Sequence, residues 1–410
     1  MFQDISKRID GYSDFVIDLQ KRLIAISSIG PENGGEGEYK KALALEGIVK
    51  ELFGECQMIN VPDSRVPSGL RPNIAAKMKG KDTLRTIWIM AHLDTVTPGN
   101  PKEWNTDPFQ AVVKDGKIYG LGSEDNHQGI ISPLLTAKAL KEAGVIPLCN
   151  FGILLTSDEE FTADWGCKHL IKNNKELFGP NDTVIVPDEG NSEGSEIEVS
   201  EKSLLWFKIK INGKQIHAAM PDKGVNSLKA AAHLICKAEG LYKVFTKKDS
   251  LFSPAISTFE PTMKEANVGN INTIPGEDIL YYDCRLLPDL KYEDVVKQME
   301  IYFREIEEDC GVKITYELPL IDLTAPGTPV NSTLVKKLTR AIEEVRKIKP
   351  HHIGIGGRTV ATYFRAAGLP CVAWATLDQM AHQPNEYCVI KNLLDDAKVL
   401  ANVFTSNVAN

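Results

Sequence analysis

The sequence has no segment long and apolar enough to cross a membrane. A membrane-spanning helix needs about 18 consecutive apolar residues, and no apolar run in the chain reaches that length. Residues 1–26 carry charges between apolar residues spaced three and four apart. This pattern predicts an amphipathic helix and not the continuous apolar core of a secretion signal. We therefore expect a cytoplasmic protein with no membrane partner.

An excess of basic residues is also missing. The chain has 47 Lys and Arg against 55 Asp and Glu, which gives a formal net charge of -8. Proteins that bind nucleic acids depend on clustered Lys and Arg side chains to neutralise phosphates. The charge balance therefore argues against a nucleic-acid partner.

The eight cysteines do not form a CxxC pair and are scattered, mostly inside apolar segments. Dispersed cysteines of this kind are typical of buried free thiols in a reducing compartment. They agree with the expected cytoplasmic location.

A length of 410 residues favours more than one domain. Segments 86–94, 150–160 and 182–190 read as buried strands, and 127–144 reads as a helix between the first two. Strands that alternate with helices predict an α/β fold with a parallel or mixed sheet.

The pattern changes near residue 200. Strand-like segments at 203–213, 277–288 and 312–319 are separated by two helical segments, which predicts a compact α+β unit. A helix and a buried strand of the first type then follow. We predict a larger discontinuous domain at 1–199 and 318–410 and an inserted domain at 200–317.

Metal-binding side chains follow the predicted strands of the larger domain. In α/β sheets, sites gather at the carboxyl ends of the strands, so these side chains are expected to meet. Histidine and carboxylate ligands suit Zn²⁺, with Co²⁺ or Mn²⁺ as alternatives. The candidates are His92, Asp94, Asp125, Glu159, Glu160, Asp188, Glu189 and His382.

The motifs that carry these residues resemble those of the M20 metallopeptidase family. They are "MAHLDTV", "GLGSED" at 120–125, "SDEE" at 157–160, the acidic strand end at 188 and "AHQPNE" at 381–386. The segments "GKQIHAAMP" and "NINTIPG" resemble the inserted lid domain of that family. The family contains acetylornithine deacetylases, succinyl-diaminopimelate desuccinylases, aminoacylases and carboxypeptidases. The resemblance implies a zinc-hydrolase catalytic domain with an inserted lid or dimerisation domain.

The resemblance also implies a site for two divalent metal ions, with Asp125 bridging them. One ion would be bound by His92 and Asp188, and the other by Glu160 and His382. "PDEG" departs from the "GEPT" of many members, so Glu189 remains an alternative to Asp188.

By the same resemblance, Glu159 is the general base and acid. Adjacent side chains on an extended segment point to opposite sides, so one glutamate can bind a metal while the other handles protons. Asp94 is expected to accept the ring N–H of His92 and fix its tautomer. Asp158 is expected to cap the turn that follows.

Residues of the inserted domain and of a glycine-rich loop resemble positions that contact substrate. His217 is expected to reach an active site, which in dimeric members is that of the other subunit. Arg358 stands where members have a small polar residue, so it either binds an extra acidic group or is a surface arginine. The predicted set is His217, Asn272, Arg285, Gly357 and Arg358.

We expect hydrolysis of the amide bond of an N-acyl amino acid, in a homodimer formed through the inserted domain. A di- or tripeptidase or a carboxypeptidase of the same family is the alternative. An inactive binding protein is disfavoured because the expected metal ligands and Glu159 are all present.

Overall fold

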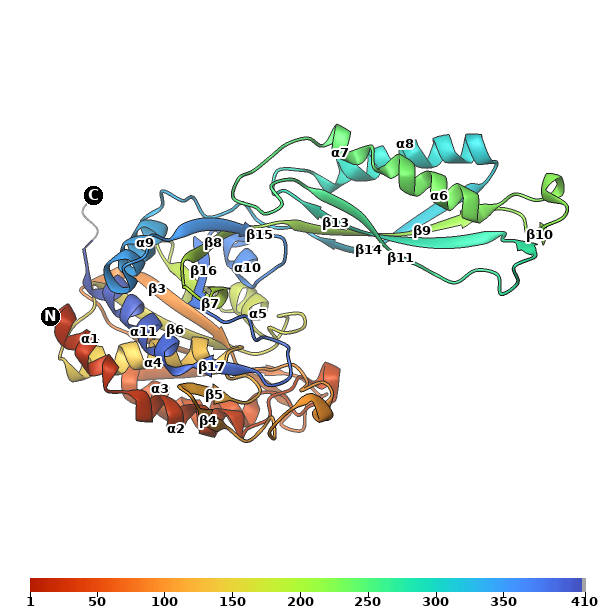
Figure 1. Ribbon diagram of the computed structural model, residues 1–410. Helices are drawn as coiled ribbons and strands as arrows, with labels where there is room; N and C mark the ends of the chain where they lie inside the picture. Colours follow the sequence, from red (N-terminus) through yellow and green to blue (C-terminus); the bar gives the residue numbers. More distant parts are fainter. Residues whose placement is uncertain (408–410) are drawn as a thin grey trace. The chain divides into compact units, whose positions relative to one another are not determined.

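The computed structural model describes residues 1–407, and the chain divides into two units (Figure 1). The larger unit comprises Met1–Val199, Thr328–Ile353 and Thr359–Asn410, and the smaller unit comprises Ser200–Gly327 and Gly354–Arg358. The expected return to the larger domain at 318 is therefore too early. Strand β14 (Lys313–Asp322) pairs with β9 of the smaller unit. The chain therefore stays in the smaller unit beyond residue 318.

An eight-stranded mixed sheet forms the centre of the larger unit, and the predicted mixed α/β fold is confirmed. Its four middle strands run parallel, and β1, β2 and β8 pair antiparallel. In spatial order the strands are β1 (Glu55–Pro62), β2 (Leu70–Met78), β6 (Cys149–Thr156), β3 (Asp82–His92), β7 (Thr183–Asn191), β16 (Cys371–Thr376), β8 (Glu196–Glu201) and β15 (His351–Ile355).

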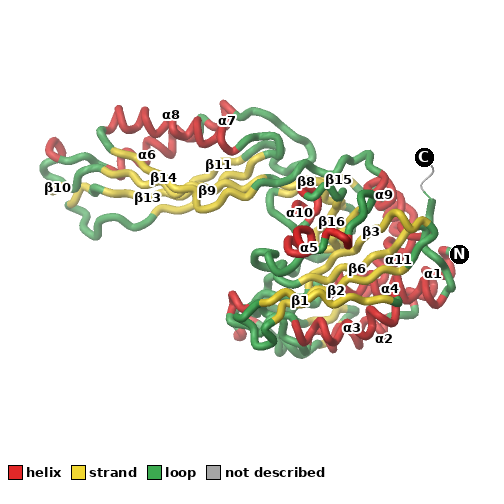
Figure 2. The backbone as a smooth tube through the Cα atoms, turned by 180° about the vertical axis from the view of Figure 1, so that it is seen from behind, coloured by secondary structure: helices red, strands yellow, loops and turns green. Residues whose placement is uncertain are grey.

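Both faces of this sheet are covered, which explains why its middle strands are almost continuously apolar. Trp88 and Met90 of β3 belong to a buried cluster with residues of α5 (Cys167–Asn173) and α10 (Ala361–Ala366). The other face carries the long helices, which pack on one another in Figures 1 and 2. They are α3 (Tyr39–Phe53), α4 (His127–Glu142) and α11 (Ile390–Thr405), with α1 (Phe2–Asp10) and α9 (Thr333–Arg346) packed against them.

Shorter elements complete the larger unit. The expected single N-terminal helix is two helices, α1 and α2 (Ser13–Ile24), with a break at Gly11 and Tyr12. The short strands β4 (Val112–Lys114), β5 (Lys117–Tyr119) and β17 (Tyr387–Val389) form a separate antiparallel sheet. Short 3-10 helices lie at Pro31–Asn33, Pro101–Glu103, Lys175–Leu177 and, in the smaller unit, Pro221–Lys223.

The smaller unit is a four-stranded antiparallel sheet with two long helices on one face, as Figures 1 and 2 both show. From Leu205 to Ile211, every second residue of β9 is buried against those helices. The strand order is β11 (Thr258–Lys264), β13 (Glu277–Leu286), β9 (Ser203–Asn212) and β14. The two long helices are α6 (Ser227–Ala238) and α8 (Tyr292–Cys310), and the short α7 (Leu241–Val244) follows α6. The sequence did not predict β11 or the ribbon of β10 (Ile216–His217) and β12 (Thr273–Ile274).

Within residues 1–407, no helix is long and apolar enough to span a bilayer. All eight cysteines fall in this range and all are free thiols, five of them buried.

Candidate metal centre

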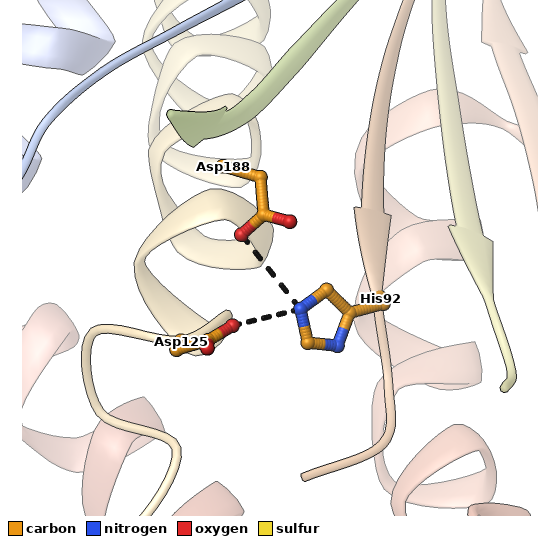
Figure 3. A group of neighbouring side chains, drawn as sticks. All are labelled: His92, Asp125 and Asp188. Atoms are coloured by element: carbon orange, nitrogen blue, oxygen red, sulfur yellow. Dashed lines mark hydrogen bonds and ion pairs between the residues drawn. The ribbon is translucent and has the colours of Figure 1, made fainter. Parts of the chain in front are cut away.

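Two groups of side chains that could each hold a metal ion lie side by side in the larger unit, and they share Asp125. The first contains His92, Asp125 and Asp188. Nε2 of His92 lies 2.9 Å from Oδ1 of Asp125 and 3.7 Å from Oδ1 of Asp188 (Figure 3). The second contains Asp125, Glu160 and His382. Nε2 of His382 lies 2.9 Å from Oε2 of Glu160 and 3.4 Å from Oδ2 of Asp125.

Asp125 therefore presents one carboxylate oxygen to each group. Its Oδ1 faces His92 and its Oδ2 faces His382. A bridging carboxylate in a site for two metal ions has this arrangement, with one oxygen available to each ion.

The fold brings these residues together from distant parts of the chain. His92 is the last residue of β3, Asp188 lies in β7, and Asp125 lies just before α4 (Figure 3). Glu160 lies in the turn after β6, and His382 lies in the segment between β16 and β17. The expectation that strand ends would converge agrees with this placement.

Asp188 belongs to the first group, whereas Glu189 belongs to neither group. The side chain of Asn126 helps to fix Asp188, because its Nδ2 donates to Oδ1 of Asp188 at 2.6 Å and to the carbonyl of Pro187 at 2.9 Å. Of the two open alternatives, the geometry therefore favours Asp188.

The acidic triplet lies in a turn, which corrects the assumption that Glu159 and Glu160 extend a strand. Strand β6 ends at Thr156, and Asp158 has a φ of 62°. This left-handed conformation breaks the strand. As expected, Asp158 caps the turn: its Oδ2 accepts the hydroxyl of Thr162 at 2.7 Å and the N–H of Asp164 at 2.8 Å.

Asp94 has a broader role than expected. Nδ1 of His92 lies 3.1 Å from the backbone carbonyl of Asp94 and 3.5 Å from its carboxylate. The carboxylate accepts the backbone N–H of Glu159 at 3.1 Å and that of Glu160 at 3.0 Å. Asp94 thus connects the end of β3 to the turn that carries both glutamates.

The gathered carboxylates change the protonation of the whole site. Burial, Asp188 and Glu160 raise the pKa of Glu159 well above its usual range. Burial and Asp125 raise the pKa of Glu160 to about 7. Hydrogen bonds to Asp125 and Glu160 raise the pKa of His382 to about 10. Burial alone would lower the pKa of His92, but Asp188 and Asp125 raise it well above its usual value.

Comparison with known proteins places the chain in a family. Residues 88–406 match the model of peptidase family M20/M25/M40. The chain belongs to this family. An uncharacterised metallohydrolase of Methanococcus maripaludis is 39% identical to it, over 95% of this chain and 98% of the relative. The chain is thus a metal-dependent hydrolase.

Two further proteins resemble the chain, one in sequence and one in structure. A succinyl-diaminopimelate desuccinylase of Nitratiruptor is 28% identical, over 90% of this chain and 94% of the relative. Aminopeptidase PepT of Bacillus cereus superposes with a TM-score of 0.75 at 21% identity, over 96% of this chain and 98% of the other. The second likeness concerns the fold.

The donor atoms of this M20 chain fit two divalent metal ions. Each group supplies one imidazole nitrogen and carboxylate oxygens, which is the donor set of many zinc sites. Within residues 1–407, Oε1 of Glu160 is buried and has no hydrogen-bond partner. Because a buried polar atom without a partner is costly, a metal ion at this position would satisfy it.

A buried ion pair next to the site was not predicted from the sequence. Arg71 donates to both carboxylate oxygens of Glu38, through Nε at 2.7 Å and through Nη2. Oε1 of Glu38 also lies 3.2 Å from the backbone nitrogen of Asp158. The ion pair therefore helps to fix the acidic turn, because Glu38 accepts the backbone N–H of Asp158.

His127 lies in neither group of ligands. It begins α4, as predicted, and its ring contacts Lys41 and Gln20. Nε2 of His127 lies 2.7 Å from Nζ of Lys41, and both side chains are buried. Burial lowers the pKa of Lys41 to about 7.

The five predicted substrate contacts all lie in the smaller unit, and they form two sets there. His217 is exposed on β10, and Asn272 is its neighbour through the hydrogen bond from Ala218 N–H to the Asn272 carbonyl. Arg285, near the other end of β13, binds both oxygens of Asp283 and donates to the carbonyl of Gly356 at 2.9 Å.

Gly357 and Arg358 follow directly, and Arg358 forms an ion pair with Asp322. Residues 277–285 of β13 span about 27 Å at a rise of about 3.4 Å per residue. The two sets therefore lie near opposite ends of β13, and one chain does not bring all five residues together within this unit.

Proposed function

We propose that the chain hydrolyses the amide bond of an N-acyl amino acid, with two metal ions and with Glu159 as the proton-transfer group. The observation that carries the proposal is the pair of ligand groups that share Asp125. Glu159 adjoins Glu160 in sequence, and its backbone is fixed by Asp94. The likeness to desuccinylases supports an acyl amino acid as substrate.

His92, Asp125 and Asp188 would hold one ion, and Asp125, Glu160 and His382 the other. Zn²⁺ suits these donors, with Co²⁺ or Mn²⁺ as alternatives. When bound, such ions lower the pKa of a water molecule and polarise a carbonyl group.

Glu159 takes a proton from the attacking water and delivers it to the departing amine. Its carboxyl group has a raised pKa because of burial and the neighbouring Asp188 and Glu160. A general base and acid must accept a proton and then return it, and a carboxylate side chain can do both. Asp94 keeps Glu159 in place through the backbone.

In the smaller unit, Arg285 and the loop at Gly357 and Arg358 are proposed to bind acidic groups of the substrate. Arg285 can grip a substrate carboxylate through two parallel hydrogen bonds once it releases Asp283, which it binds in this structure. His217 and Asn272 are proposed to serve the active site of the other subunit in a homodimer. Their position at the other end of β13 from Arg285 supports this division.

The proposal is tested by hydrolysis of a substrate panel after chelation and reloading with Zn²⁺, Co²⁺ or Mn²⁺. The panel contains N-succinyl-diaminopimelate, N-acetylornithine, N-acetylmethionine and several dipeptides. We expect metal-dependent release of amine from an acyl compound. Turnover of the dipeptides alone would show a peptidase and overturn the acyl-amino-acid substrate.

Two variants control the panel. Glu159→Gln should lower turnover of the preferred substrate by about 10²–10⁴-fold. Asp164→Asn alters an exposed carboxylate in the same loop and should react as the wild type does. Absence of turnover on the whole panel, with metal bound, would argue for a binding role.

A further inference from the structure

Two glutamates that no mechanism step uses tie together the loops that carry Asp125 and His382. Glu386 is 1% exposed, and its carboxylate accepts hydrogen bonds from the loop before α4. Its Oε2 accepts the N–H of Gly122 at 2.8 Å. Its Oε1 accepts the N–H groups of Glu124 at 2.9 Å and of Asp125 at 3.0 Å.

Glu124 makes the opposite connection. It is 3% exposed, and its two carboxylate oxygens accept the N–H groups of Asp378 and Met380. Each loop therefore carries a metal-binding residue together with the glutamate that grips the backbone of the other loop. Glu124 is adjacent to Asp125, and Glu386 lies in the same short segment as His382.

Two other side chains also hold the segment that carries His382: Gln379 donates to the carbonyl of Gly190, and Asn385 donates to the carbonyl of Glu103 at 2.8 Å. The segment lies between β16 and β17, outside regular secondary structure. The side chain of His382 is 56% exposed, and its φ is 61°. An exposed residue in a left-handed conformation keeps one position only if its surroundings hold it there.

The first ligand group is anchored differently. His92 and Asp188 lie on β3 and β7, and Asn126 binds the carboxylate of Asp188 at 2.6 Å. These two strands are paired in the sheet. Strand positions hold ligands without help from Glu124.

We propose that Glu124 and Glu386 are positioning residues that form a reciprocal clamp, and that Glu124 preorganises the second ligand group selectively. The inference rests on the two-metal centre of the proposed function. Partners that orient metal ligands typically contribute about 10–100-fold to metal affinity. Glu124 holds only the His382 segment, whereas Glu386 holds Asp125, which both groups share.

The two substitutions should therefore differ. Glutamine keeps the size of the side chain, but its amide NH₂ group faces one of the backbone N–H groups. Two donors then face each other, and that hydrogen bond is lost. Glu124→Gln should weaken binding of one ion by about 10–100-fold and leave the other unchanged. Glu386→Gln should weaken both ions, because it loosens the bridging Asp125.

The experiment is a calorimetric titration of the chelated full-length protein with Zn²⁺ and with Co²⁺, followed by measurement of bound metal after dialysis. Asp182→Asn is the matched control. Asp182 is 2% exposed and accepts the N–H groups of Thr86 and Gly179 and the indole N–H of Trp88. It lies beside the start of β7, at the opposite end of the strands from the metal centre. It tests what neutralising a buried carboxylate does by itself.

Retention of two ions with wild-type affinity in Glu124→Gln would overturn the clamp. Equal weakening of both ions in that variant, or the same change in Asp182→Asn, would also overturn it. If Glu124→Gln does not fold, as judged by circular dichroism, Glu124→Asp serves in its place. The aspartate keeps the charge but is too short to reach both N–H groups, so the same selective loss is expected.

These outcomes are separate from those of the substrate panel. A wild-type chain that binds two ions but hydrolyses nothing would overturn the proposed reaction and leave the clamp to be decided by the titration. A wild-type chain that binds no divalent ion would overturn the metal centre and the clamp together.

Discussion

The carboxylate of Asp94 accepts the backbone N–H of Glu160 at 3.0 Å, and this bond joins the segments that carry the candidate metal ligands His92 and Glu160. Asp94 follows β3, which carries His92, and Glu160 lies beyond β6. The same carboxylate also holds Glu159. The relative positions of a first-group ligand, a second-group ligand and the proposed base thus depend on one side chain.

Replacing Asp94 should therefore reduce turnover more than replacing an exposed carboxylate would. Asp94→Ala removes both side-chain oxygens that accept backbone N–H groups, whereas Asp94→Asn keeps one. Loss of a partner that orients ligands costs about 10–100-fold in affinity or activity, and we expect the larger effect for alanine. Steady-state kinetics with measurement of bound metal would check this. Unchanged kcat in Asp94→Ala would contradict it.

Glu159→Gln should lower kcat while the metal ions remain bound. Positioned proton transfer contributes about 10²–10⁴-fold to the rate, and Glu159 is in neither ligand group. The variant is compared with Glu160→Gln, which should lose metal as well as activity. Equal metal loss in both variants would show that Glu159 is a ligand.

Substitutions of the adjacent residues Asp188 and Glu189 should have different effects on metal binding. Oδ1 of Asp188 lies 3.7 Å from Nε2 of His92, whereas Glu189 is outside both groups. We expect Asp188→Asn to weaken one metal ion and Glu189→Gln to leave both in place. Bound metal per chain after dialysis gives the answer, and the reverse pattern would make Glu189 the ligand.

The convergence of strand ends could be predicted from the sequence because each strand end carries its own polar signal. His92, Asp125 and Asp188 stand out against the apolar runs that precede or follow them. Their approach in space follows from the parallel order of the middle strands. The mixed α/β fold could be predicted for the same reason, from local apolar patterns.

The supporting residues could not be predicted, because their partners are backbone groups far away in the chain. Glu386 was visible inside "AHQPNE", but the N–H groups that it accepts lie about 260 positions earlier. The turn at Asp158 depends on a positive φ at a non-glycine residue. The apolar run before Asp158 does not predict that conformation. The domain boundary was missed because β14 continues pairing beyond its apolar part.

The buried pair of Glu38 and Arg71 should matter greatly for stability. Both side chains are fully buried, and removing one partner of a buried pair costs about 3–5 kcal/mol because the other charge remains. Arg71→Met should lower the free energy of unfolding by that amount in urea denaturation. The double variant Glu38→Leu/Arg71→Met should cost less than the sum of the two single changes. The exposed pair of Asp4 and Arg8 is the control, and Asp4→Asn should change little.

Metal binding should release protons, and affinity should therefore rise with pH. In the metal-free site the pKa of His382 is raised to about 10 by hydrogen bonds to Asp125 and Glu160. A histidine ligates only when its nitrogen is free of the proton. At neutral pH the ion must therefore displace that proton, and this cost shrinks as pH approaches the raised pKa.

The dissociation constant should consequently fall by about tenfold per pH unit for each proton released. Below about 7, Glu160 also holds a proton, so the dependence should be steeper there than above it. Titrations in two buffers with different heats of ionisation count the protons directly. His382→Asn should release fewer protons than the wild type. Equal binding heats in the two buffers would mean that no proton is displaced. His382 would then not be protonated before the metal ion binds.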